Sequence, residues 1–500
     1  MNSRIFEQKV SEALQLLDLG KSVKAFLAFK ELVKAAPRQP RLWMAYASAA
    51  CGLGQLAAAE GAWKNAKELD PNNTENLLKI GHCYEAFRCR GMAMSHFEEA
   101  ARSDPLAINP RISQALLHEK LHHLDAARRS VEECLAIDAR DEQATYLSAL
   151  LDSREEKFEK AEERLRDLIA SDPKHEYVRY AARYKLAEIL DRTGRYAEAM
   201  DCLKAAKVLV AGLADMEVLA RQYESTAQAL RERAKQSPKN CLRAWARKFP
   251  EKSRSTIPHL VFLGGHPRSG TTLLEKVLGS HPEVGAIDEP MTTQIAKEAL
   301  SRQPVGSWIP QLNLARQRYI QCLTQALPDD RKCKVLLEKN PSPTASLPIL
   351  LKVFPELRVI VALRDPRDVV LSCYFQNIPL NATNANFLTF ERCVKHYRYL
   401  MDVWLAVREW EAFSWIETKY EDVVVNHESE LRHVTQFTGV EWHAKQGQFF
   451  SENGAVYSPT YHDVTQPIYP RSLARWRNYL RYLEPFFPDL EPYCRAFGYS

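Results

Sequence analysis

The segment VFLGGHPRSGTTLLEKVL, residues 261–278, has the residue types and spacing of a phosphate-binding loop. Four residues separate Gly265 from Gly270, as in the G-x-x-x-x-G-K-[ST] pattern, whose backbone N–H groups surround phosphate oxygens. Thr271 replaces the lysine of that pattern, and the nearby Arg268 supplies a forked guanidinium suited to phosphate or sulfonate oxygens. The segment therefore predicts an anion site. The residues expected to contact the anion are Arg268, Ser269, Gly270, Thr271 and Thr272.

A second anion site is predicted in RDPRDVVLS, residues 364–372. Asp365 and Pro366 are typical of the N-cap and first position of a helix. Arg364 precedes the cap and Ser372 lies two turns into the helix, so both can hold a phosphate near the helix start. The alternative is that Arg364 pairs with Asp368 on a solvated face, where such pairs contribute little stability.

These segments belong to a series of apolar runs that alternate with helix-length segments, which is typical of a parallel sheet with helices on both faces. The runs are residues 259–265, 284–288, 334–338, 357–363 and 413–418. Each is followed by a polar residue: Arg268, Glu289, Lys339, Arg364 and Tyr420, in chain order. Ligands of open α/β sheets bind beyond the carboxyl ends of the strands, so the pattern predicts one site at this edge.

The first half of the chain repeats with a period of 34 residues. The recurring positions are Ala25, Ala59, Ala93, Ala127 and Ala161, then Phe29, Trp63 and Phe97, and then Pro37, Pro71, Pro105 and Pro173. This pattern indicates helical hairpins. The small residue lets two helices approach, the aromatic residue fills the gap between them, and the proline ends the second helix. The units resemble tetratricopeptide repeats, and this resemblance implies about six units over residues 5–210, with a groove that binds a peptide or protein partner.

HEKLH, residues 118–122, fits the zinc-binding pattern H-E-x-x-H. The repeat register places His118 at the end of a first helix and His122 in the turn, and no third ligand is indicated. We therefore expect no metal site here.

The length of the chain predicts two or more domains, since 500 residues are more than a single hydrophobic core usually supports. The net charge of +5 permits an anionic ligand without requiring a nucleic acid. Eleven cysteines without C-x-x-C pairs favour reduced thiols. No run is long and apolar enough to span a membrane, and no signal peptide is evident, so a cytoplasmic protein is expected.

The second half resembles sulfotransferases that use 3′-phosphoadenosine 5′-phosphosulfate (PAPS), and in particular the tyrosylprotein sulfotransferases. GGHPRSGTTLLEKVLGSHPEV resembles their 5′-phosphosulfate loop, and RDPRDVVLS their 3′-phosphate motif. EKNP, KYED and QPIYPRSLARWRNY also have counterparts in that family. The resemblance implies a sulfotransferase domain over residues 257–500, after a connecting helix and linker over 211–256.

The resemblance also implies roles for the residues at the strand ends. Glu289, 21 residues after Arg268, matches the family's catalytic base, with Asp288 as the neighbouring alternative. Lys339 and Arg268 would stabilise the transferring sulfonate without a metal. The residues expected to bind the donor are Arg268, Ser269, Gly270, Thr271, Thr272, Arg364, Ser372 and Tyr420, with Arg471 and Arg475 closing over it.

Two positions depart from the family pattern: Ala474 replaces a serine of the closing segment, and Gln376 replaces a donor-contacting arginine. Whether Ser472, two residues before Ala474, substitutes for that serine is left open by the sequence. Both departures bear on tyrosine specificity more than on the type of reaction. The acceptor is therefore expected to be a hydroxyl, with protein tyrosine, a glycan and a small alcohol or phenol all open. The alternatives are a P-loop kinase, opposed by the missing lysine, and a non-catalytic repeat scaffold with a degenerate nucleotide-binding domain.

Overall fold

The computed structural model describes residues 3–19, 21–246, 259–290, 292–293, 295–297, 309–327, 333–451 and 470–499. The chain forms two compact units, Met1–Val178 and Arg179–Ser500. This division falls inside the predicted repeat array, so the ranges 5–210, 211–256 and 257–500 stay predictions. Parts of the linker (247–256) and of the closing segment (466–469) lie outside the described residues.

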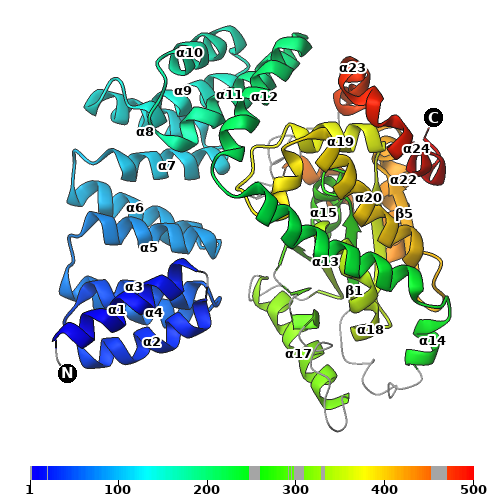
Figure 1. Cartoon of the computed structure of the whole chain (residues 1–500), viewed down its shortest axis with the longest axis horizontal. Coiled ribbons are helices and arrows are strands. Elements are labelled where there is room, and N and C mark those ends of the chain that lie inside the picture. The colour runs from blue at the N-terminus through cyan, green and yellow to red at the C-terminus, as the bar shows by residue number, and fades with distance from the viewer. Residues whose placement is uncertain are drawn as a thin grey trace. The chain divides into compact units, whose positions relative to one another are not determined.

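The first unit consists of successive helical hairpins, coloured blue to cyan in Figure 1. Its helices are α1 (Ser3–Asp18), α2 (Ser22–Ala35), α3 (Pro40–Cys51), α4 (Leu56–Leu69), α5 (Thr74–Ala86), α6 (Arg90–Ser103), α7 (Ile108–Lys120), α8 (Leu124–Ile137), α9 (Glu142–Arg154) and α10 (Phe158–Ala170). The second helices of the hairpins begin 34 residues apart, at residues 22, 56, 90, 124 and 158. The period predicted from the sequence is therefore confirmed, and the unit is a solenoid of the tetratricopeptide-repeat type.

Small and aromatic residues at the repeated positions make up the core of this solenoid. The five periodic alanines are fully buried, and Phe29, Trp63 and Phe97 are at most 3% exposed. Gly81 shows how closely the helices approach, because a Cβ at this position would lie 2.4 Å from Phe97 Cε1. Asp70 and Pro71 follow the last residue of α4, as expected for a pair that ends a helix.

The second unit begins with α11 (Glu176–Arg192), which the division cuts after Val178, and continues with a five-stranded sheet and its helices. The helices that precede the sheet are α12 (Tyr196–Ala211), α13 (Met216–Gln236) and α14 (Cys241–Ala246). The strands are β1 (His259–Gly265), β2 (Val284–Asp288), β3 (Val335–Lys339), β4 (Arg358–Leu363) and β5 (Ser414–Lys419). The described α-helices among and after them are α15 (Thr271–Gly279), α17 (Ile309–Gln325), α18 (Leu347–Val353), α19 (Pro366–Tyr374), α20 (Phe390–Val407), α21 (Tyr420–Val425), α22 (His427–Thr438), α23 (Leu480–Leu483) and α24 (Phe487–Phe497).

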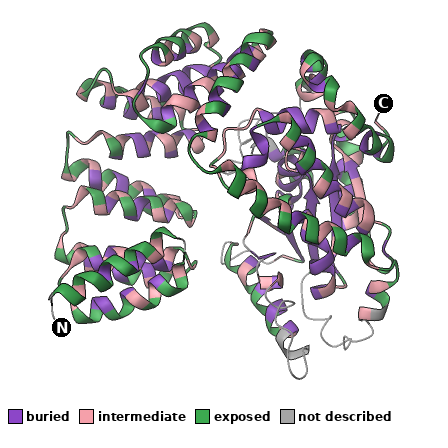
Figure 2. Ribbon diagram, viewed as in Figure 1, coloured by how far each residue is buried: buried purple, intermediate pink, exposed green. Residues whose placement is uncertain are grey.

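The sheet is parallel and has the strand order β2-β3-β1-β4-β5. Each of the five predicted strands is present within one residue of its predicted bounds. Buried residues run along β1, β3 and β4 and along the helix faces that cover them (Figure 2). Because the strands are parallel, their carboxyl ends share one edge, where β1 ends at Gly265, β3 at Lys339 and β4 at Leu363.

Candidate functional site

The loop between β1 and α15 has the strand–turn–helix setting that the sequence predicts. Gly270 is the residue before the helix and adopts φ 89°, which an L side chain rarely tolerates. A Cβ at this position would also lie 2.7 Å from Cδ2 of Tyr420. Ser269, Thr271 and Thr272 are buried at the start of α15, where the backbone N–H groups of a helix N-terminus can bind an anion.

Arg268 connects this loop to the second predicted anion site. Its Nε donates a hydrogen bond to Ser372 Oγ over 3.1 Å, and its backbone carbonyl accepts one from Arg364 Nη1 over 3.2 Å. Arg268 has φ 76°, a backbone conformation uncommon for arginine and often found at functional sites. The structure thus brings together Arg268, Arg364 and Ser372, which the sequence places in two separate motifs.

The Arg364 guanidinium is buried at the end of β4. Its Nη2 donates to the backbone oxygen of Ser472 over 2.6 Å, and its Cζ lies 4.8 Å from the centroid of the Tyr420 ring. Its Nε is buried without a hydrogen-bond partner, so this guanidinium retains a donor for a ligand.

Asp365 caps α19 by accepting from the backbone N–H of Arg367, which confirms the predicted helix start. Asp368 lies 4.0 Å from Arg364, but this pair is buried and not on a solvated face. Burial raises the pKa of Asp368 to about 6, although the positive charge of Arg364 opposes the shift.

A lysine between two carboxylates forms the other half of the site. Lys339 at the end of β3 is 0% exposed, and its Nζ donates to Glu289 Oε1 over 3.0 Å and forms an ion pair with Asp288. Burial lowers the pKa of Lys339, but the two carboxylates outweigh it, so the pKa lies above its ordinary value. The Glu289 side chain is 55% exposed, so its carboxylate is accessible to a ligand, whereas Asp288 is 12% exposed.

The predicted closing arginines differ in their surroundings. Arg475 forms an ion pair with Asp191 of α11, with Nη2 3.0 Å from Oδ2, and its guanidinium stacks on Phe375 at 4.1 Å. Arg471 is exposed in a short 3₁₀ turn, Pro470–Ser472. The structure therefore holds Arg475 in a local ion pair and leaves Arg471 at the surface, and donor binding by either one stays a prediction.

A pair of buried histidines packs at the loop after β1. His266 Nδ1 donates to the Pro267 carbonyl over 2.7 Å, so His266 Nε2 accepts from His396 Nδ1 over 2.8 Å. Burial lowers the pKa of His266 to about 4 and that of His396 well below its ordinary value. Both rings are therefore neutral at pH 7, and His266 binds the Pro267 carbonyl of the loop.

The structure places His118 and His122 as the repeat register predicts, at the end of a helix and in the turn after it. Helix α7 ends at Lys120, and His122 has φ 60° in the turn that follows. Within the described ranges, no group of three or more histidine, cysteine, aspartate or glutamate residues is placed to hold a metal ion.

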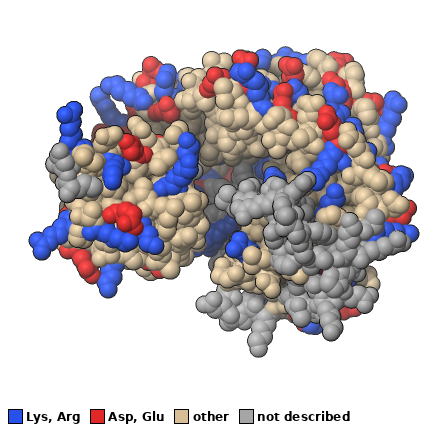
Figure 3. Space-filling model, turned by 60° about the horizontal axis from the view of Figure 1, so that its bottom comes forward, with Lys and Arg blue, Asp and Glu red and all other residues tan. Residues whose placement is uncertain are grey.

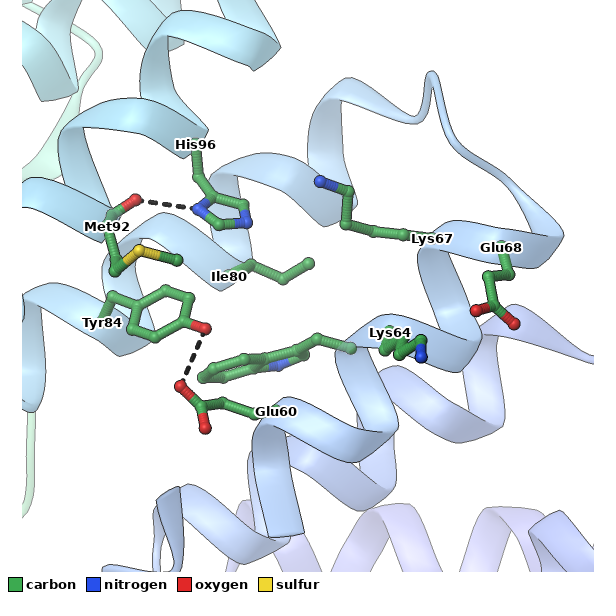
Figure 4. A pocket seen from close by; sticks show the side chains of 9 residues that line it. Glu60, Lys64, Lys67, Glu68, Ile80, Tyr84, Met92 and His96 are labelled. Atoms are coloured by element: carbon green, nitrogen blue, oxygen red, sulfur yellow. Dashed lines mark hydrogen bonds between the residues drawn. The ribbon is translucent and has the colours of Figure 1, made fainter. Parts of the chain in front are cut away.

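A cavity of about 440 Å³ lies among α4, α5 and α6 of the first unit (Figure 4). Its lining residues are Glu60, Trp63, Lys64, Lys67, Glu68, Ile80, Tyr84, Met92 and His96. The rings of Trp63 and Tyr84 lie 4.8 Å apart, and the Tyr84 hydroxyl donates to Glu60 over 3.1 Å. These rings also pack the repeat core, so the cavity is a depression over that core and is lined mainly by apolar groups.

Acidic and basic side chains are interspersed over the face shown in Figure 3. This distribution accords with the small net charge of +5. Among the described helices, none is both long and apolar enough to cross a bilayer.

Two residues of the site region were not assigned a role from the sequence. Asp191 lies far from the sheet motifs in the chain, and Glu338 lies inside an apolar run that was interpreted as a strand. Ser472, which the sequence places in the closing segment, contributes its backbone carbonyl to Arg364. Only Glu338 left a signal, because a carboxylate in the otherwise apolar run KVLLE requires partners.

Residues 258–444 match the model described as "Sulfotransferase family". They correspond to the sheet and its loops, so this part of the second unit is similar to sulfotransferase domains. This match confirms the resemblance noted in the sequence.

The curated relatives of this chain include zebrafish (Danio rerio) protein-tyrosine sulfotransferase 1, which is 23% identical over 43% of this chain and 65% of its own length. An uncharacterized protein of Aquifex aeolicus is 26% identical over 46% of this chain and 32% of its own length. The chain therefore spans about one third to two thirds of these relatives. Among solved structures, the sulfotransferase domain of the Synechococcus PCC 7002 olefin synthase aligns with a TM-score of 0.31 and 18% identity, over 47% of this chain and 97% of that one.

Proposed function

We propose that this protein transfers a sulfonate group from PAPS to a hydroxyl acceptor. The observation that carries the proposal is the Lys339–Glu289 pair, which lies at the same sheet edge as the linked residues Arg268, Ser372 and Arg364. A base beside a buried cation, next to a cluster of anion-binding groups, has the parts that sulfonate transfer requires.

The donor fits the described residues at two positions. The loop from Ser269 to Thr272 presents hydroxyls and backbone N–H groups suited to the 5′-phosphosulfate. Arg364 and Ser372 suit the 3′-phosphate, and the unpartnered Nε of Arg364 is a donor that such a ligand would satisfy. Tyr420 supports Arg364 by stacking on its guanidinium.

In the proposed reaction, Glu289 accepts the proton of the acceptor hydroxyl, whose oxygen attacks the sulfur of PAPS. The S–O bond to the 5′-phosphate breaks, and 3′,5′-bisphosphoadenosine leaves with that oxygen. Lys339 and Arg268 stabilise the negative charge that develops on the transferred group and on the leaving oxygen. The exposure of Glu289 supports its role as base, since an acceptor must reach it.

We propose protein tyrosine as the first acceptor to test, because the curated relatives include protein-tyrosine sulfotransferases from several animals. The repeat array would bind a peptide or protein that carries the acceptor. This role is supported by the helical-hairpin solenoid, an architecture that commonly provides extended binding surfaces.

The test is sulfonate transfer from labelled PAPS to tyrosine peptides, glycans and small phenols, with and without Glu289→Ala. Transfer that is lost in Glu289→Ala while PAPS still raises the melting temperature supports the proposal. Transfer unaffected by Glu289→Ala contradicts the role of the base. If PAPS fails to stabilise the chain whereas ATP with Mg²⁺ does, a kinase becomes the better hypothesis.

A further inference from the structure

Glu338 precedes Lys339 on β3 and is 1% exposed, so its carboxyl group is buried. Neighbouring residues of a strand face opposite sides, so Glu338 belongs to a different layer from Lys339. Its carboxylate accepts hydrogen bonds from the Tyr319 hydroxyl, from Thr292 Oγ1 over 2.8 Å and from Asn340 Nδ2 over 3.3 Å. Such a buried group is retained only when donors satisfy it, and here three do so.

Residues 338–340 fasten the chain at Glu289 and just after it. The Glu289 backbone N–H donates to the Lys339 carbonyl over 2.8 Å. Asn340 Nδ2 also donates to the Pro290 carbonyl over 2.9 Å, and Thr292 reaches Glu338 as described. These three anchors therefore end on three consecutive residues, 338–340.

Glu289 requires such anchoring because its backbone has φ 47°. A left-handed conformation costs about 1–3 kcal/mol for a residue of this kind and persists only when its surroundings determine it. Glu289 Oε1 lies 3.0 Å from Lys339 Nζ, and a relaxed backbone would move it away from that nitrogen.

We infer that Glu338, together with Asn340 and Thr292, is a positioning element that holds Glu289 in this left-handed conformation, against Lys339 and facing the acceptor. The inference rests on the proposed function for the role of Glu289. None of the three residues needs to contact either substrate.

The test compares the variants Glu338→Gln, Asn340→Ala and Thr292→Val with the unsubstituted chain. Thr292→Ser retains the hydroxyl and is the conservative rescue. Glu356→Gln is the matched control, because Glu356 is also a carboxylate that accepts from a side chain of α17, Arg316, but lies outside the network. Turnover, the KM for PAPS and the affinity for 3′,5′-bisphosphoadenosine are measured for each variant.

The kinetic result we expect is selective. Turnover falls about tenfold to a hundredfold in the three variants, as for a small misplacement of a catalytic group, while donor affinity changes less than twofold. Thr292→Ser and Glu356→Gln keep turnover near that of the unsubstituted chain. Each of the three substitutions, added to Glu289→Ala, produces no loss of turnover beyond that of Glu289→Ala alone, because the network acts only through Glu289.

Hydrogen exchange of the 284–290 segment provides a readout that is independent of activity. Exchange at the Glu289 amide is expected to accelerate in Asn340→Ala and Glu338→Gln, but not in Glu356→Gln. Unchanged exchange, unchanged turnover, or an equal loss of turnover and donor affinity overturns the inference. If the unsubstituted chain transfers no sulfonate, the proposed function fails, and the exchange measurement still decides whether the network anchors Glu289.

Discussion

Arg268 Nε donates a hydrogen bond to Ser372 Oγ over 3.1 Å, and this contact joins the loop after β1 to the helix after β4. The two residues are separated by 104 positions in the chain. Their contact means that the 5′ and 3′ parts of the proposed donor site are coupled through a side chain as well as through the sheet.

Ser372→Ala is therefore expected to weaken binding of 3′,5′-bisphosphoadenosine by about ten- to a hundredfold, since a hydrogen bond to a charged group contributes about 1.5–3 kcal/mol. Arg268→Gln is expected to weaken the same binding. The double variant should lose less binding free energy than the sum of the two single losses, because the two residues are in contact. Isothermal titration calorimetry gives the affinity for 3′,5′-bisphosphoadenosine of the unsubstituted chain, the two single variants and the double variant. Strict additivity would show that the contact does not couple the two motifs.

Lys339→Met is expected to destabilise the second unit by about 3–5 kcal/mol, because it leaves the largely buried Asp288 carboxylate without its cation. Adding Asp288→Asn should recover part of that loss. Urea titration, monitored by a probe in the second unit, gives the free energy of unfolding of that unit for each variant. The control is Lys334→Met, whose partner Glu283 is partly exposed, and which should change stability by at most about 1 kcal/mol.

The buried pair His266 and His396 should make the free energy of unfolding depend on pH. The pKa of His266 is about 4 when folded, against an ordinary value of about 6.5. A lowered histidine pKa gives a stabilising contribution that is complete above about pH 6.5 and is lost as the pH falls toward 4. For His266 alone the loss is on the order of 3 kcal/mol.

The measurement is the free energy of unfolding from pH 7.5 to pH 4 for the unsubstituted chain and for His266→Gln with His396→Gln. The difference between the two proteins should shrink as the pH falls. Asp368, whose pKa is raised to about 6, acts in the opposite direction in both proteins and cancels in the comparison. Parallel curves would rule out the histidine pair as the cause.

Gly81→Ala is expected to destabilise the repeat unit by about 1–3 kcal/mol, because its Cβ would lie 2.4 Å from Phe97 Cε1 in a fully packed core. Gly61→Ala is the matched control, since nothing lies within 4 Å of a Cβ there. It should stabilise α4 by about 0.5–1 kcal/mol. Thermal unfolding that ranks the two variants in the opposite order would contradict the packing described for α5 and α6.

Local features of this chain were predictable from the sequence, because their causes lie within a few residues. The apolar runs gave all five strands, and Asp365 followed by Pro366 gave the start of α19. The 34-residue period gave the hairpins, since each unit repeats the same packing positions. The next hairpin departs from the period by four residues, since α12 begins at residue 196, 38 residues after the start of α10.

Contacts between distant segments were not predictable. The strand order depends on which runs pair, and the runs themselves do not specify it. The ion pair of Arg475 with Asp191 joins residues 284 positions apart and changes the surroundings of a residue expected to bind the donor. The left-handed backbone at Glu289 arises from the anchors on β3, and glutamate as a residue type gives no sign of it.

The central place of β1 separates two tasks in space. The strands on one side, β3 and then β2, end in Lys339 and Asp288, while those on the other, β4 and β5, end beside Arg364 and Tyr420. In the proposed function, the residues that act on the acceptor and those that bind the nucleotide thus lie on opposite flanks of one strand. A change of acceptor would then require substitutions on the β2 flank and would leave the nucleotide flank unaltered.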